Sequence, residues 1–198
     1  MAEPEAQNGP ERLAAFSDGV IAILITIMVL DLRPPHALGL AALWPMRLTF
    51  LSYALSFLFL SIAWINHHQL VRDVKHVQPC LMWSNLGFLF GLSLLPFGTA
   101  YMAEQNMAPF TVALYAFIFL VSTLAYIVME LFVAAQSGEH AGVKQATIRR
   151  SLLALLIFGG AIPCAFLSGW LALALIVGGA TLYALSDWIR RRSQGKSA

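Results

Sequence analysis

Apolar stretches long enough to cross a lipid bilayer recur along the whole 198-residue chain. A transmembrane helix needs about 20 mostly apolar residues. Only 11% of the residues are charged and 59% are hydrophobic, whereas about a quarter of a typical soluble domain is charged. The sequence therefore predicts an all-α integral membrane protein, a six-transmembrane-helix bundle. The predicted helices span residues 13–32, 41–66, 80–103, 109–135, 149–168 and 170–190.

These six stretches leave little sequence for a soluble module. We expect a disordered N-terminal tail over residues 1–11, a six-helix transmembrane domain over 12–192 and a short basic C-terminal tail over 193–198. The first ten residues are polar and acidic, and they lack the basic start and the small-residue cleavage site of a signal peptide.

Prolines mark several of the predicted helix ends. The pair beginning at Pro34 ends the first helix, because proline cannot continue the backbone hydrogen-bond ladder. Pro79 and Pro109 lie where helices start, a position that tolerates a missing amide hydrogen. Pro96 and Pro163 fall inside helices and predict kinks.

The basic residues predict the orientation in the membrane. Cytoplasmic loops carry an excess of Lys and Arg. If the N-terminus is inside, the outer side holds only Arg33 and Arg47. Both termini are therefore predicted to be cytoplasmic. We expect the protein to lie in the cell inner (plasma) membrane. The basic residues on the inner side are then Arg12, Arg72, Lys75, Lys144, Arg149, Arg150, Arg190, Arg191, Arg192 and Lys196.

Several functional classes lack support in the sequence. The charge pattern does not indicate nucleic-acid binding, and no nucleophile motif indicates an enzyme. Cys80 and Cys164 form no disulfide framework or metal-binding spacing. His67, His68 and His76 could in principle bind a metal, but adjacent histidines on a helix point apart. We therefore expect no metal site and no cofactor.

The first predicted helix carries two distinct faces. At 100° per residue, Ile23, Ile27 and Leu30 lie within about 60° of one another. Asp18 points roughly 140° away from Ile23. A branched apolar row of this kind is typical of lipid-facing or core packing in any membrane helix. By itself it does not indicate a pore.

Asp18 needs a partner, because a carboxylate inside a membrane helix is costly unless it is paired or faces water. Polar residues at a similar depth predict a hydrogen-bond network that ties the first helix to the second and third. It could serve as a structural clamp or as a proton or ion site, and the sequence leaves both open. The candidate partners of Ser17 and Asp18 are Arg12, Trp64, Asn66, His67, Ser84 and Asn85.

At the sequence RLAAFSDGVIAILITI, over residues 12–27, the chain resembles the first-helix signature of the transmembrane-protein-175 family of potassium channels. The segment Trp64-Ile65-Asn66-His67 is similar to the end of that family's second helix. The resemblance implies a homotetramer in which the first helices of four subunits line a central pore. It also implies that bulky apolar rings close the pore.

The resemblance further implies roles for individual residues. Ile23, Ile27 and Leu30 would form the pore constriction, and Thr26 would contribute to selectivity. A polar network would hold the first helix against its own subunit. The residues implied or predicted for this network are Arg12, Phe16, Ser17, Asp18, Trp64, Asn66, His67 and Asn85.

The leading hypothesis is a potassium-preferring cation leak channel in a lipid bilayer, with monovalent cations as permeant species and potassium as cargo. The chain lacks a Thr-Val-Gly-Tyr-Gly filter, so a narrow apolar constriction would have to discriminate between ions. Asp31 would concentrate cations at the outer mouth. The alternative is a proton-coupled transporter or proton-conducting pathway that uses Asp18 and His67.

Overall fold

Long α-helices make up nearly all of the structure. The computed structural model describes residues 9–137 and 141–194, with side chains described for residues 9–136, 149 and 151–182. None of these residues lies in a strand. The elements in chain order are α1 (Gly9–Ile27), η2 (Met28–Asp31), η3 (Leu40–Met46), α2 (Arg47–Arg72), α3 (Pro79–Ser93), α4 (Leu95–Glu104), α5 (Pro109–Ser137), α6 (Ala141–Leu167) and α7 (Gly169–Gln194).

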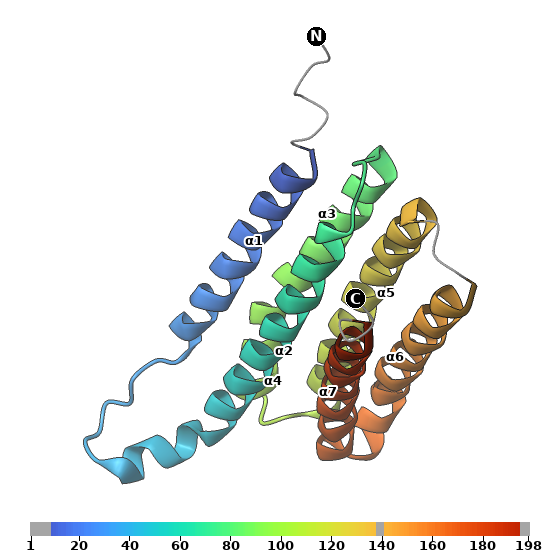
Figure 1. The fold of residues 1–198 in the computed structure, drawn as a ribbon. Helices are drawn as coiled ribbons and strands as arrows, with labels where there is room; N and C mark the ends of the chain where they lie inside the picture. Colours follow the sequence, from blue (N-terminus) through green and yellow to red (C-terminus); the bar gives the residue numbers. More distant parts are fainter. Residues whose placement is uncertain (1–8, 138–140, 195–198) are drawn as a thin grey trace.

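The helices pass up and down the molecule side by side, and α3 and α4 together form one pass (Figure 1). α1 lies at one edge of the bundle, where it packs mainly against α2 and α3. α6 and α7 pack against each other and against α5. Within the part of the chain that the structure describes, one long face of α1 therefore has no neighbouring helix.

The membrane character predicted from the sequence is confirmed. Four helical stretches are long and apolar enough to cross a bilayer, and they are Gly9–Asp31, Leu40–Arg72, Pro79–Glu104 and Pro109–Gln136. Two shorter apolar helices follow within the described part of the chain, Ser151–Leu167 and Gly169–Leu182. All six predicted ranges overlap these stretches, while the number of spans and the side on which the termini lie stay predictions.

The observed helix ends differ most from the predicted ones at four places, two of which are the start of α6 at Ala141 instead of residue 149 and the end of α7 at Gln194 instead of residue 190. α1 begins at Gly9, so residues 9–11, assigned to the tail, are helical. α2 continues to Arg72, well beyond residue 66, because polar side chains end an apolar run without ending the backbone hydrogen-bond ladder. Trp64 and His67 consequently lie inside α2 and not at its end.

The two prolines inside predicted helices have different outcomes. α3 ends at Ser93 and α4 begins at Leu95, so the break expected near Pro96 is present. α6 continues as one helix through Pro163, and the kink there stays a prediction. The helical part of α1 and η2 ends at Asp31, shortly before Pro34 as expected.

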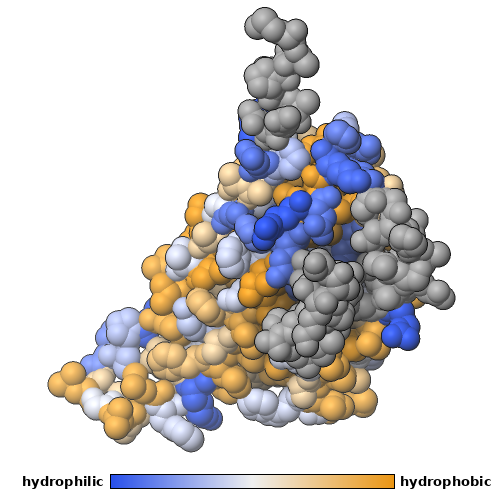
Figure 2. Space-filling view, viewed as in Figure 1, coloured by the Kyte–Doolittle hydropathy of each residue, from blue (hydrophilic) through white to orange (hydrophobic). Residues whose placement is uncertain are grey.

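The exterior is largely apolar, as a bilayer requires. Figure 2 shows hydrophobic side chains over most of the visible flank, with hydrophilic ones gathered mostly in the upper half. Arg12, Arg72 and Lys75 lie toward the end where α1 begins, and Arg33 and Arg47 lie toward the opposite end. Six further basic residues lie outside the described side chains, namely Lys144, Arg150, Arg190, Arg191, Arg192 and Lys196.

Candidate functional site

One side of α1 is buried against the rest of the subunit. Leu13, Ser17, Ile21, Leu24 and Met28 recur at intervals of three or four residues, and all are buried. This spacing is that of one helix face. It fixes which side of α1 points away from the bundle.

The outward side of α1 carries the three branched residues that were predicted to form a constriction. Ile23 is 56% exposed, Ile27 45% and Leu30 72%. Leu30 lies in η2, and side chains three positions apart are eclipsed in a 3₁₀-helix. The change from α1 to η2 therefore brings Leu30 nearer to the line of Ile27 than a continuous α-helix would.

Two polar residues border this apolar row. The Thr26 hydroxyl donates within its own helix, with the Ile23 carbonyl oxygen at 2.9 Å and the Ala22 carbonyl oxygen at 3.1 Å. Its hydrogen is thus used locally, which leaves the oxygen as an acceptor on the exposed side. Asp31 ends η2 and interacts electrostatically with Glu104 and Arg33.

A buried polar contact joins α1 to α2 and α3 through Asn85. The Asn85 Nδ2 donates to Ser17 Oγ at 3.0 Å, and the Asn85 Oδ1 lies 2.7 Å from His67 Nε2. A carboxamide oxygen only accepts, so His67 Nε2 carries the hydrogen of this bond. All three side chains are fully buried. The His67 ring also stacks on Phe88, with ring centroids 5.4 Å apart and planes inclined by 3°.

A second, more exposed contact holds Asp18. The Trp64 indole Nε1 donates to Asp18 Oδ1 at 2.8 Å. His68 Nδ1 lies 3.6 Å from Asp18 Oδ2, an ion-pair distance too long for a hydrogen bond. Trp64 and His68 are four residues apart, one helical turn on α2, so one face of α2 presents both groups to the carboxylate.

The structure does not bring every predicted residue into these contacts. Among the described side chains, Asp18 has no ion pair with Arg12, which is exposed. Phe16 is 54% exposed and lies on the outward side of α1. The backbone carbonyl of Asn66 accepts from Tyr126, and the Ser84 hydroxyl donates to carbonyls of its own helix.

Sequence reasoning missed two sets of polar residues. His68 was expected to point away from its neighbour, and it does so, but toward Asp18. Ser56 was not singled out, although its hydroxyl lies 2.6 Å from Thr99 Oγ1 and 2.5 Å from Tyr115 Oη. That buried contact joins α2, α4 and α5. Its sequence signal is weak, because serine and threonine hydroxyls are common in membrane helices and can bond to their own helix.

The arrangement does not resemble a catalytic or metal centre. Within the described residues, no group of three or more His, Cys, Asp or Glu side chains could hold a metal ion. The polar groups lie between helices as contacts that position α1, while the outward face of α1 is apolar. Chemically, this site can hold a helix in place and present an apolar row.

Comparison with known proteins places the chain in a family. A family model described as "Endosomal/lysosomal potassium channel TMEM175" matches residues 12–96. A protein of Chryseobacterium sp. (strain P1-3) that is named a potassium channel is 42% identical over 135 residues, which cover 68% of this chain and 70% of that protein. The chain belongs to the TMEM175 family.

Two more TMEM175 proteins show how far the likeness extends. The crystal structure of a lysosomal potassium-selective channel TMEM175 homolog from Chamaesiphon minutus has a TM-score of 0.77 and 27% sequence identity, and the match covers 89% of this chain and 97% of that one. A Gallus gallus protein named endosomal/lysosomal proton channel TMEM175 is 26% identical over 53% of this chain and 22% of its own length. TMEM175 is a family of ion channels and not of enzymes.

Proposed function

We propose that this TMEM175 protein is a potassium-preferring cation channel of the cell inner membrane, formed by four copies of the chain. In this assembly the α1 helices of the four copies surround a central pore. Ile23, Ile27 and Leu30 form apolar rings that constrict it. Residues 12–192 form the channel domain, and both chain ends lie in the cytoplasm.

The observation that carries the proposal is the exposed apolar row on α1. The opposite face of α1 is buried and bonded to its own subunit, so the row is free to meet other copies. One helix cannot enclose a pore, and a closed ring of identical subunits supplies the missing walls. The family membership and the potassium-channel names of the bacterial relatives support the choice of ion.

Selectivity would arise from the constriction itself. A ring of isoleucine and leucine side chains offers no oxygen ligands, so it favours the cation that sheds its water more readily. The Thr26 oxygen is the nearest exposed acceptor, and Asp31 would attract cations at the outer end of the row. We expect a weaker preference for potassium over sodium than a carbonyl filter provides.

Flux from proteoliposomes tests the pore assignment. Purified protein should carry potassium down its gradient, with a reversal potential that shifts toward the potassium equilibrium value. Ile23→Asn should increase the flux severalfold, because a polar ring lowers the barrier to a hydrated ion. Leu156→Asn is the matched control, since Leu156 is also strongly exposed but lies on α6. Absence of cation flux, or equal flux from wild type and Ile23→Asn, would show that this row does not line a pore.

Proton conduction is the second candidate, because the animal relatives carry the name proton channel. The described contacts give little support to a route inside one subunit. Asp18 contacts Trp64 and His68, while His67 bonds to Asn85, so the two residues of the alternative hypothesis belong to separate contacts. Measuring the reversal potential in a proton gradient separates proton from potassium current.

A further inference from the structure

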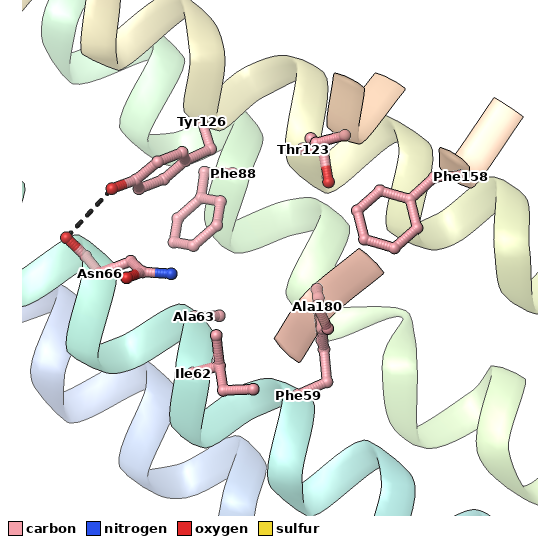
Figure 3. A pocket seen from close by; sticks show the side chains of 10 residues that line it. Phe59, Ile62, Ala63, Asn66, Phe88, Thr123, Tyr126, Phe158 and Ala180 are labelled. Carbon is pink, nitrogen blue, oxygen red and sulfur yellow. Dashed lines mark hydrogen bonds between the residues drawn. The ribbon is translucent and has the colours of Figure 1, made fainter. Parts of the chain in front are cut away.

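A small cavity lies inside the subunit, away from α1. It is lined by residues of α2, α3, α5, α6 and α7, is partly open, and has a volume of about 50 Å³ (Figure 3). Its walls are mainly apolar, with the aromatic rings of Phe59, Phe88 and Phe158 and the small side chain of Ala180. Among the described residues that line it, none carries a carboxylate, ammonium, guanidinium or imidazole group.

Two hydrogen-bonding side chains lie at this cavity without a protein partner. Figure 3 shows the Asn66 carboxamide and the Thr123 hydroxyl directed toward the space near Phe88 and Phe158. Asn66 is only 7% exposed. Among the described residues, neither of these side-chain groups takes part in a hydrogen bond, whereas the neighbouring Ser122 hydroxyl donates to the Ile118 carbonyl.

A hydrogen-bonding group that faces mainly apolar walls gains from a ligand that supplies a partner, so a ligand with one hydrogen-bonding group would be favoured here. A water molecule needs about 10–15 Å³ of cavity volume, so about 50 Å³ is room for a few non-hydrogen atoms. The apolar walls favour carbon over water for the rest of the ligand. The lack of charged lining groups favours a neutral one.

We propose that this cavity binds a small neutral amphiphile, a short carbon chain with one hydroxyl or carbonyl group. Its polar group bonds to the Thr123 hydroxyl, and its carbon chain packs between Phe88, Phe158 and Ala180. The cavity thus gives the protein a ligand site separate from the pore-lining row of α1.

The site is one side chain away from the contacts that hold α1. Phe88 forms a cavity wall and also stacks on His67. His67 in turn donates to Asn85, which bonds to Ser17 of α1. A ligand that moves Phe88 therefore acts on the hydrogen bonds that anchor α1. This consequence rests on the proposed channel function, whereas ligand binding does not.

Fluorine NMR with 2,2,2-trifluoroethanol as the probe tests the binding site on purified full-length protein. We expect saturable binding with a Kd on the order of 1 mM, because few atoms make contact. n-Propanol, an alcohol of similar size, should displace the probe. A linear signal without saturation, the behaviour of partitioning into detergent, would show that no such site exists.

Three variants locate the binding. Ala180→Val fills the cavity and should abolish saturable binding, whereas Ala174→Val, on an exposed position of the same helix, should leave it unchanged. Thr123→Val keeps the side-chain shape, removes the hydroxyl and should weaken binding about tenfold, the effect of one hydrogen bond. It also serves if Ala180→Val fails to fold. Equal saturable binding by wild type, Ala180→Val and Thr123→Val would overturn the proposal.

Potassium flux with and without saturating n-propanol tests the connection to α1. Flux should change in wild type and in Ala174→Val but not in Ala180→Val. An unchanged flux in protein that binds the probe would overturn the connection through Phe88. If no variant carries potassium at all, the channel function fails while the binding result stands.

Discussion

At the scale of single residues, Asn85 of α3 is the side chain that links α1 and α2 in the buried polar contact. It bonds to Ser17 on α1 and to His67 on α2, and all three groups are buried. Asn85→Leu keeps the branching and the number of non-hydrogen side-chain atoms but leaves two buried polar groups without partners. We expect a loss of about 1–3 kcal/mol in stability. The thermal unfolding midpoint in detergent measures it.

The neighbouring Ser84 provides a matched control for this experiment. Its hydroxyl donates only to the carbonyls of Cys80 and Leu81 in its own helix. Ser84→Ala should therefore change the stability by less than about 0.5 kcal/mol. Equal midpoints for Asn85→Leu and Ser84→Ala would mean that the network does not anchor α1.

Substitutions of Asp18 distinguish between a structural clamp and a proton site at this residue. Asp18→Asn retains an oxygen that accepts from Trp64 Nε1 but loses the charge that attracts His68. As a clamp, Asp18→Asn should be destabilised less than Asp18→Ala, and both should carry potassium in proportion to the folded protein. If Asp18→Asn folds and assembles normally yet loses all flux, the residue is part of the transport path.

The polar contacts of α1 could be predicted in outline from the sequence. Depth along the helices brought Ser17 and Asn85 to the same level, because a membrane helix has a known rise per residue. Depth does not give the rotation of a helix about its axis, so the sequence could not show that His68 faces Asp18. At 100° per residue, in contrast, Phe16 falls on the same side of the first helix as Ile23, and the structure shows it exposed there. Arg12 is long and exposed, and no rule fixed its partner.

At the scale of elements, the close packing of α3 on α5 depends on Gly91. A methyl group added there would collide with the Ser122 side chain and lie 3.0 Å from the Ser122 Cα, which is backbone and cannot move aside cheaply. Gly91→Ala should cost about 1–3 kcal/mol of stability. The thermal unfolding midpoint measures this loss, and the elution profile in size-exclusion chromatography shows whether the protein stays assembled.

Gly87, one turn earlier on the same helix, distinguishes this packing effect from helix propensity. A Cβ at Gly87 would lie 3.7 Å from the Ala125 Cβ, an ordinary contact. Alanine is favoured over glycine in a helix by about 1 kcal/mol, so Gly87→Ala should be neutral or stabilising. Destabilisation of both variants by the same amount would contradict the packing argument.

The element boundaries show which helix signals a sequence carries. Proline is a local steric signal, so the break near Pro96 could be placed in advance. The end of α2 could not, because hydropathy reports the thickness of the apolar core and not the end of the hydrogen-bond ladder. The last turns of α2 are mostly polar, and the helix ends at Arg72.

At the scale of the whole molecule, α1 is an edge helix with two apolar sides. Its inner side packs on α2 and α3, and its outer side exposes Ile23, Ile27 and Leu30. Apolar exposure alone is compatible with lipid, because the hydrocarbon core covers such a surface at no cost. A residue that lines a pore can be reached by an ion from the aqueous phase, whereas a residue that faces lipid cannot. This access distinguishes the two environments.

Metal block at Leu30 tests that access. In a background of Cys80→Ser and Cys164→Ser, Leu30→Cys would place four thiols around the axis of a tetramer, near the outer end of the apolar row. Zn²⁺ binds thiolates tightly, and an ion held by two or more of these thiols would occupy the pore, so micromolar Zn²⁺ should reduce the potassium current at least tenfold. Leu131→Cys, on an exposed position of α5, should stay unblocked. A thiol that faces lipid is reached neither by the aqueous ion nor by three further thiols. If Zn²⁺ blocks Leu131→Cys but not Leu30→Cys, the ion path therefore lies on another surface.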